Sequence, residues 1–558
     1  MGELAHAPAG RAVILTGGRF RTGLPGVPAA EAIWIEGGTI RAVGSTAEIR
    51  SRAGTSGGKP VSLAGSCVTP GWTDAHAHVL TLGLTAEQVD LTGAESVAAV
   101  QERIRSHLAE RAPSTSWILG RGWDQTRWPG GAYPEHRDLD VVTGDRPAVF
   151  TRIDGHAAWA NLAAMRAGGL DDAAPDPPGG SVLRDAAGRL TGILIDAAMD
   201  AVGRVTPAFE ETRRRDAVAR VARRLLRHGV TAVHDMGLTS GDAALFERLD
   251  ASGELGVRVY GALLGTDPGL DRVLAAPPRR TEGRFELGMV KFFVDGALGS
   301  RGAALFEPYC DDPANRGLDV TPLPELRAGL ARVVDAGYQA AVHAIGDRAN
   351  RGVLDCWEAL TAARPGYGAG RPAPPLRVEH AQILHPDDLD RFSEMGVVAS
   401  MQPAHCISDM PWAEERLGAE RLAYAYAWRS LRDRGVVLAA GSDFPIETPD
   451  PRYGFFAAVA RRSPHDPDAQ PWNPGERLTR AEALAAFTAA PARVAGHGDR
   501  RGILAPGYAA DLAIWDRDLF EVPERALLDA EVWTTMVDGK VGWRHPGAPF
   551  PPLHEVHE

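Results

Sequence analysis

The sequence predicts an α/β protein that combines a (β/α)8 barrel of the TIM type, a small β-sandwich domain built from both chain termini, and an insertion after the first barrel strand. Three observations support this prediction. Eight apolar segments of strand length alternate with helical stretches, both chain ends carry short strands with glycine turns, and one connection is about 150 residues long. The 558 residues suffice for a barrel of ~250 residues and these additional parts.

The two ends of the chain share one pattern of short strands. Neither end has enough strands to bury a sheet face alone, so we expect residues 1–66 and 501–558 to pair into one small domain. Asp538–Gly539 is typical of a hairpin turn. The predicted strands are Ala12–Leu15, Ala32–Glu36, Thr39–Val43, Asp511–Trp515 and Val532–Val537.

Residues 67–500 contain the predicted barrel. Helical stretches such as Thr212–His228, Pro322–Ala336 and His385–Met395 lie between its strands, which indicates a closed parallel barrel. A doubly wound open sheet is the alternative, but no G-x-G-x-x-G motif follows the first strand. The eight predicted strands are Cys67–Thr73, Val230–His234, Val257–Leu263, Met289–Val294, Tyr338–His343, Leu376–His380, Val397–Met401 and Val436–Ala440.

The long connection, residues 79–228, is rich in tryptophan and in Gly/Pro turns. A segment of this length needs a fold of its own, so we interpret it as an insertion or lid over the carboxyl ends of the strands. A structural elaboration without a role at the site is the alternative. Its tryptophans include Trp117, Trp123, Trp128 and Trp159.

The composition is that of a soluble globular protein, with 44% apolar and 24% charged residues. The formal charge of −12 and the lack of a long basic run argue against nucleic-acid or anionic-membrane partners. No stretch approaches ~20 apolar residues, and Met1–Arg11 lacks the pattern of a secretory signal. The four cysteines form no C-x-x-C pair, so we expect a cytoplasmic protein.

Two histidines, His76 and His78, lie at the end of the first predicted strand. Histidines two apart on a strand face the same side, so both imidazoles can reach one cation. A chance or packed pair is the alternative. Barrels of this kind keep their active sites at the carboxyl ends of the strands, which favours metal binding.

Ligand-type residues also stand at four further strand ends. Strands four, five, six and eight carry Lys291, His343, His380 and Asp443. Each alone is more often structural, as a buried histidine bonded to backbone or an aspartate that caps a helix. Their joint occurrence at one rim predicts a metal centre.

Lys291 is the most informative of these residues because the chain has only three lysines: Lys59, Lys291 and Lys540. An ammonium in an apolar strand costs several kcal/mol unless it is paired or deprotonated. A neutral amine can react with carbon dioxide to give a carbamate, an anionic ligand that can bridge two cations. Pairing of Lys291 with Asp295 is the alternative.

The order of these motifs resembles the amidohydrolase superfamily, and the surrounding segments resemble its YtcJ-like branch, which includes N-substituted formamide deformylases. The likeness spans essentially the whole chain. The segments that carry it are Pro70–His78, Ile153–Asn161, Gly229–Gly237, Lys291–Ser300, Val342–Asp347, Val378–Gln382 and Gly441–Pro445.

The resemblance implies two divalent cations, with zinc as the first expectation. It implies that His76, His78 and Asp443 bind one ion, that His343 and His380 bind the other, and that carboxylated Lys291 bridges them. Asp443 is then also the expected catalytic acid and base.

The implied activity is hydrolysis of a C–N bond, in an amide of N-formyl or N-acyl type, by metal-activated water. A cyclic amidase, an esterase or a deaminase with the same metals is the first alternative. A metal-binding regulatory protein without catalysis is an alternative of another class.

Four residues are candidate contacts for a small-molecule substrate: His156, Trp123, Asp295 and Gln402. His156 can orient a substrate carbonyl or be a hydrogen-bonded core histidine. Trp123, with Asp124, is expected to line the pocket, and Asp295 to support the ligands. Gln402 and His405 follow the seventh strand and face the same rim, whereas His234 and Asp235 are expected to support their neighbours. The sequence leaves the substrate and a homo-oligomeric state open.

Overall fold

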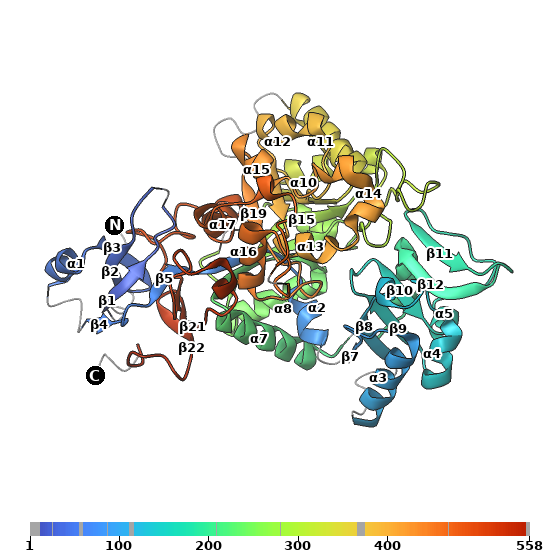
Figure 1. Cartoon of the computed structure of the whole chain (residues 1–558), viewed down its shortest axis with the longest axis horizontal. Coiled ribbons are helices and arrows are strands. Elements are labelled where there is room, and N and C mark those ends of the chain that lie inside the picture. Colours follow the sequence, from blue (N-terminus) through green and yellow to red (C-terminus); the bar gives the residue numbers. More distant parts are fainter. Residues whose placement is uncertain are drawn as a thin grey trace.

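The chain forms three bodies in a row (Figure 1). The small β-domain with both termini lies at one end, the barrel in the middle and the insertion at the other end. This computed structural model describes residues 12–24, 26–54, 60–85, 88–110, 117–207, 209–279, 281–364, 374–466 and 468–553. The sequence features at residues 1–11 and Lys59 lie outside the described residues.

The central body is an eight-stranded parallel sheet whose strands follow one another in chain order. An isolated parallel bridge between Ala77 and Phe444 brings the last strand segment back to the first, so the sheet is nearly closed. The predicted α/β barrel is thereby confirmed. Its strands are β6 (Trp72–Ala77), β13 (Val230–Leu238), β14 (Arg258–Leu264), β15 (Phe285–Phe293), β16 (Gln339–Ala344), β17 (Arg377–His380), β18 (Val398–Met401) and β19 (Leu438–Ala440).

The prediction for the first barrel strand was wrong in its start. Residues Cys67–Pro70 form β5, which pairs antiparallel with β20 (Leu512–Trp515) in the terminal sheet, and the barrel strand begins only at Trp72. Gly71 makes this crossing between sheets possible, because a Cβ atom there would lie 2.3 Å from Thr231 Oγ1. One apolar run therefore serves two sheets.

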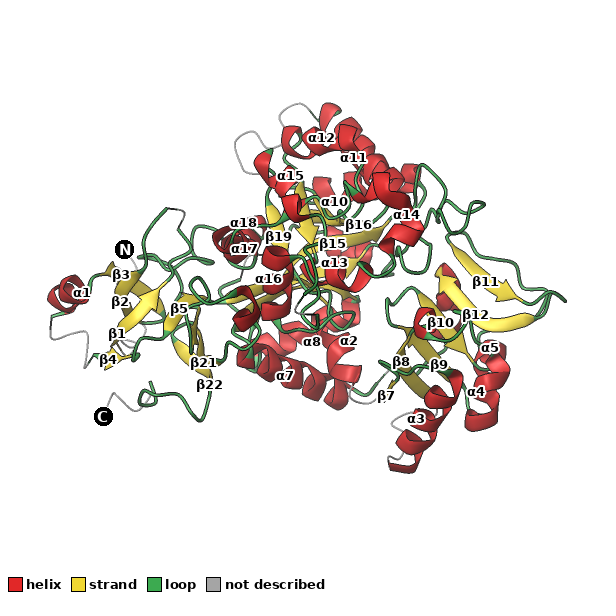
Figure 2. Ribbon diagram, viewed as in Figure 1, coloured by secondary structure: helices red, strands yellow, loops and turns green. Residues whose placement is uncertain are grey.

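Helices surround the barrel sheet (Figure 2). In α7 (Glu211–Arg227) the buried residues Val218, Val221, Ala222 and Leu225 recur at helical spacing and face the barrel. The helix predicted at His385–Met395 is shorter in the structure, because a 3-10 turn, η3 (Pro386–Asp388), precedes α12 (Leu389–Glu394). The other barrel helices are α2 (Val79–Thr85), α8 (Ser240–Ala251), α9 (Leu270–Leu274), α10 (Leu323–Asp335), α11 (Asp347–Ala362), α13 (Pro403–Asp409), α14 (Ala413–Leu422), α15 (Trp428–Asp433), α16 (Pro451–Ala460), α17 (Arg480–Ala486) and α18 (Ala489–Val494).

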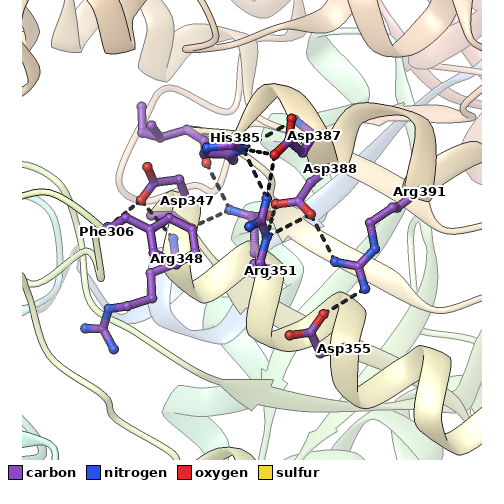
Figure 3. Close-up of polar contacts among 12 residues, drawn as sticks. Phe306, Asp347, Arg348, Arg351, Asp355, His385, Asp387, Asp388 and Arg391 are labelled. Atoms are coloured by element: carbon purple, nitrogen blue, oxygen red, sulfur yellow. Dashed lines mark hydrogen bonds and ion pairs between the residues drawn. The ribbon is translucent and has the colours of Figure 1, made fainter.

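Charged side chains fasten the connections at the barrel mouth to one another (Figure 3). Asp347, the first residue of α11, accepts a hydrogen bond of 2.9 Å from the backbone N–H of Phe306 in the long connection after β15. Arg351 and Arg391 both donate to Asp388 in η3. The connections that follow strands β15, β16 and β17 are thus held together.

The terminal segments form one mixed sheet in the order β22-β21-β20-β5-β1-β2-β3, with β4 beside β1. Asp538 and Gly539 join β21 to β22 with φ of 53° and 69°, as a two-residue hairpin turn requires. The elements are β1 (Ala12–Phe20), β2 (Ala30–Glu36), β3 (Thr39–Gly44), α1 (Thr46–Ala53), β4 (Val61–Ser62), β5, β20, η5 (Glu524–Leu527), β21 (Val532–Val537) and β22 (Lys540–Arg544).

The insertion has its own six-stranded sheet, in the order β11-β12-β10-β9-β8-β7. The insertion spans fewer residues than the predicted range 79–228. The helices near the two ends of that range, α2 and α7, pack on each other beside the barrel. The elements of the insertion are β7 (Val89–Asp90), α3 (Val97–Glu110), β8 (Ile118–Trp123), η1 (Gln125–Arg127), α4 (His136–Thr143), β9 (Ala148–Arg152), β10 (Ala157–Ala160), α5 (Leu162–Ala167), β11 (Gly180–Arg184), β12 (Leu190–Asp196), η2 (Ala197–Met199) and α6 (Asp200–Gly203).

Candidate metal centre

Three residues from different strands converge at the carboxyl end of the barrel. His76, His380 and Asp443 are buried, and one ligand-type atom from each lies within 4.8 Å of the others. His78 follows β6 directly, and its Nε2 lies 3.2 Å from Asp443 Oδ1, while His76 Nε2 lies 3.5 Å from the same oxygen. Four of the six predicted ligands therefore surround one point.

A buried carboxylate clamps the loop that carries Asp443. Asp74 on β6 accepts hydrogen bonds from the backbone N–H of Ser442 at 2.9 Å and from its hydroxyl at 2.6 Å. The backbone N–H of Asp443 donates to the carbonyl oxygen of His76 at 2.7 Å, and Asp443 has a φ of 60°. These contacts hold Asp443 in a left-handed conformation that non-glycine residues rarely adopt.

The second predicted pair, His343 and His380, lies beside this group. The centroids of their rings are 4.5 Å apart, and the His76 and His380 centroids are 4.9 Å apart. His343 Nε2 lies 3.4 Å from Asp295 Oδ1. Asp295 itself accepts backbone N–H hydrogen bonds from Ala304, Ile345 and Gly346, so it joins the connections after β15 and β16.

Lys291 is buried in β15 with 1% of its surface exposed. Burial lowers the pKa of its ammonium to about 8, although Glu379 and Asp443 oppose this effect. Nζ lies 5.0 Å from the centroid of the Phe293 ring. The alternative of a Lys291–Asp295 ion pair was wrong: among the described residues no ion pair joins these two side chains, and the Asp295 carboxylate accepts from three backbone N–H groups.

The protonation states of these residues are those required to bind a cation. Burial lowers the pKa of His76 to about 4 and the pKa values of His343 and His380 well below 6.5, so all three imidazoles are neutral, as ligands must be. Burial raises the pKa of Asp443, but His76 and His78 outweigh it and hold that pKa below its usual range. His380 Nδ1 is buried and has no hydrogen-bond partner. Imidazole and carboxylate donors of this kind fit zinc and related divalent ions.

The insertion contributes His156 to the same region. Its ring centroid lies 5.3 Å from that of His343, and its Nδ1 lies 2.6 Å from Asp196 Oδ1. Burial lowers the pKa of His156, but attraction to Asp196 and their hydrogen bond outweigh burial and raise it to about 9. His156 is therefore cationic at neutral pH and lies beside the predicted second ligand pair.

Two of the predicted substrate contacts were wrong. Trp123 has 0% exposure and packs against Trp128 and Trp159 in the core of the insertion, where its Nε1 donates to the carbonyl oxygen of Phe150. Asp295 also has 0% exposure and serves backbone groups. Neither side chain can contact a substrate, because surrounding atoms cover both.

The remaining expectations concern Gln402, a predicted substrate contact, His405 at the rim, and the predicted supporting residues His234 and Asp235. Gln402 is buried and donates from Nε2 to the carbonyl oxygen of Ser400 at 3.0 Å, so its amide nitrogen points back toward the strand. His405 faces the site, with Nε2 3.8 Å from Asp443 Oδ2. His234 Nδ1 lies 2.7 Å from Arg377 Nη1, and Asp235 accepts the N–H of Val79, which agrees with a supporting role.

Sequence reasoning missed four residues at the site. Glu379 contacts His76, Arg377 contacts Glu379, Asp196 contacts His156, and Arg121 donates to the carbonyl oxygen of Pro445. A signal existed for Arg377 and Glu379, since charged residues in a buried strand need a reason just as Lys291 does. No local pattern points to Arg121 or Asp196.

A parallel barrel with buried imidazoles and a carboxylate at the carboxyl ends of its strands has the architecture of a barrel enzyme. Residues 59–542 match the model of the Amidohydrolase family. The chain therefore belongs to the amidohydrolase family and is a hydrolase.

Known proteins resemble this chain along nearly its whole length. It is 32% identical to putative amidohydrolase YtcJ of Bacillus subtilis over 94% of this chain and 98% of that protein. It is 27% identical to N-substituted formamide deformylase of Arthrobacter pascens over 93% and 96% of the two chains. The crystal structure of an uncharacterized metal-dependent hydrolase from Pyrococcus horikoshii matches with a TM-score of 0.75 and 28% identity, over 92% and 99%. Among the described residues, no helix is long and apolar enough to cross a membrane.

Proposed function

We propose that the protein is a metal-dependent amidohydrolase that holds two divalent cations and hydrolyses the C–N bond of an N-formyl or N-acyl amide. The observation that carries this proposal is the buried convergence of His76, His380 and Asp443, with an unpartnered Nδ1 on His380. The likeness to a formamide deformylase supports the choice of bond.

The chain offers donors for two ions. His76, His78 and Asp443 would hold the first, and His343 and His380 the second, since these two sets come together at the same rim. Lys291 would bridge them as a carbamate. Its low pKa supports this role, because a neutral amine reacts with carbon dioxide by forming an N–C bond and releasing one proton.

Bound cations would supply a Lewis acid for the substrate carbonyl and would lower the pKa of water. Asp443 is ionised and lies at the centre of the group, so it can accept a proton from the attacking water. It then delivers that proton to the leaving nitrogen as the C–N bond breaks. Water and amide give a carboxylic acid and an amine, and no side chain acts as nucleophile.

The His156 imidazolium would donate a hydrogen bond to the carbonyl oxygen. Asp196 occupies Nδ1, which leaves Nε2 as the free donor. Negative charge grows on that oxygen as water adds, so a fixed cationic donor stabilises the transition state more than the substrate. The insertion would therefore contribute a residue to catalysis.

The test is to load the purified protein with zinc and to offer a panel of N-formyl and N-acyl amides. We expect release of amine and acid and a metal content near two ions per chain. Cyclic amides, esters and amino-heterocycles in the same panel separate the alternatives by their products. His380→Asn should lose metal and activity, whereas the matched control His545→Asn, in the small domain, should keep both. A zinc-loaded protein that cleaves no linear amide contradicts the proposal.

A further inference from the structure

We propose that Glu379 is the positioning residue for His76, and that Arg377 holds Glu379 in place so that His76 presents Nε2 to the metal centre. This inference rests on the proposed function, since it concerns how one ligand of that centre is oriented. Glu379 and Arg377 contact no expected substrate atom, so their effect would act through His76.

The positions of the two charged residues follow from strand geometry. Arg377 and Glu379 are two residues apart on β17, so both side chains face the interior of the barrel. Each has 0% exposure. Branched apolar side chains normally fill this layer of a barrel, so a buried charged pair here requires an explanation.

Glu379 touches Nδ1 of His76, while Nε2 of the same ring is directed toward Asp443. Its Oε2 lies 2.7 Å from His76 Nδ1, and His76 Nε2 lies 3.5 Å from Asp443 Oδ1. A carboxylate at this distance accepts a proton that Nδ1 carries, so the lone pair of the neutral ring is on Nε2. Hydrogen bonds of this kind orient metal-binding histidines and raise their basicity.

Arg377 fixes Glu379 in turn. Its Nε donates to Glu379 Oε1 at 2.8 Å, and its Nη2 donates to the carbonyl oxygen of Ala75 at 2.7 Å and to Ser400 Oγ at 2.9 Å. The guanidinium thus joins β17 to β6, directly before His76, and to β18. Its planar fork and permanent charge suit this task better than a lysine.

The energetics indicate that this ion pair serves orientation. A buried ion pair gains little over apolar side chains of similar volume, because desolvation offsets the attraction between its charges. The pair therefore needs another reason to be present. Asp295 behind His343 offers a contrast, since it lies at 3.4 Å and is shared among three backbone N–H groups. The contact between Glu379 and His76, at 2.7 Å, is the shorter of the two.

The test compares Glu379→Gln with Glu476→Gln. Glu476 is a buried glutamate that accepts from the backbone N–H of Ser430 in α15, and it serves as the matched control. Metal-free protein would be titrated with Zn²⁺ against a chelating dye. We expect about 10- to 100-fold weaker binding of the first ion in Glu379→Gln and no change in Glu476→Gln.

The outcomes separate this inference from the proposed function. Wild-type zinc affinity at both sites in a folded Glu379→Gln protein overturns the inference alone. A wild-type protein that binds no Zn²⁺ overturns the proposed function itself. If the variant fails to fold, a crystal structure of the zinc-loaded wild type decides: Nε2 of His76 on the metal, with Nδ1 still on Glu379, supports the inference, and Nδ1 on the metal overturns it.

Discussion

Arg121 Nη1 donates a hydrogen bond of 2.6 Å to the carbonyl oxygen of Pro445, two residues after Asp443. Arg121 lies on β8 of the insertion, and Pro445 lies in the loop after the last barrel strand. A second bond at 3.4 Å joins the same guanidinium to the carbonyl oxygen of Ile153, three residues before His156. One side chain therefore sets the distance between the insertion and the proposed catalytic loop.

We predict that Arg121→Met lowers kcat/KM by about 10- to 100-fold, because hydrogen bonds from charged donors contribute about 1.5–3 kcal/mol. Hydrogen exchange should increase in residues 443–448. Arg103→Met is the matched control, since Arg103 donates to the carbonyl oxygens of Asp90 and Thr92 within the insertion. Equal activity in the two variants would contradict a role for the Arg121 bridge.

The pair of His156 and Asp196 predicts a pH dependence. The pKa of His156 is raised above its unfolded value of 6.5 to about 9, so its contribution to stability is complete below pH 6.5 and is lost as pH rises through about 9. Activity should decline as pH rises through about 9, where His156 loses its proton. In Asp196→Asn the decline should occur at lower pH, because burial lowers the pKa of His156 once the Asp196 carboxylate is gone.

The measurement is the pH profile of kcat/KM in both proteins. Asp140→Asn removes a similar contact, 2.7 Å from His136 Nδ1, and should leave the profile unchanged. An alkaline limb that stays in place in Asp196→Asn would show that the His156 charge is not used.

Lys291→Arg should reduce activity by at least about 100-fold, since a guanidinium stays protonated and cannot form a carbamate. Labelled carbon dioxide should give a carbamate carbon signal in the wild type that Lys291→Arg lacks. Lys540→Arg, at an exposed position in β22, should behave as wild type. The bridging role fails if the signal is absent from active wild-type protein.

Removal of metal should lower the melting temperature of the wild type. Zinc that binds only the folded protein adds about 2.7 kcal/mol when its free concentration is 100 times Kd. Calorimetry with and without a chelator measures the shift, and added zinc should reverse it. His380→Asn should show a smaller shift, and a shift of full size would remove His380 from the ligand set.

Asp409 predicts a pH-dependent stability outside the ligand set. Burial raises its pKa from 3.8 to about 6, so the folded protein keeps a proton that the unfolded chain releases. The free energy of unfolding therefore falls as pH rises from about 4 to 6 and is level above that. Asp409→Asn should gain up to about 3 kcal/mol at pH 7.5 and nothing at pH 3.5.

Denaturant unfolding at the two pH values measures this effect. The exposed Asp433→Asn is the control. A loss of stability at pH 7.5 would mean that the hydrogen bonds from Gln382 and Tyr426 to Asp409 Oδ2 outweigh the cost of the buried charge.

Strand order and the candidate ligands could be predicted because they depend on local patterns. Apolar runs placed seven of the eight barrel strands, and His343 and His380 stand at strand ends as expected. The start of the first barrel strand could not be predicted from the sequence. The predicted segment Cys67–Thr73 runs from β5 into β6, and only Gly71 separates these two strands. Periodicity shows that a segment is buried, but not in which sheet.

The sequence by itself determined which residue types stand at the barrel rim: His76, His78, Lys291, His343, His380 and Asp443. Only the tertiary structure decided what holds them, such as Glu379 behind His76, 303 residues away, and Asp196 behind His156. It also placed Trp123 inside the insertion. The physical reason is that residue type and spacing act along the chain, whereas orientation depends on contacts between segments that only folding brings together.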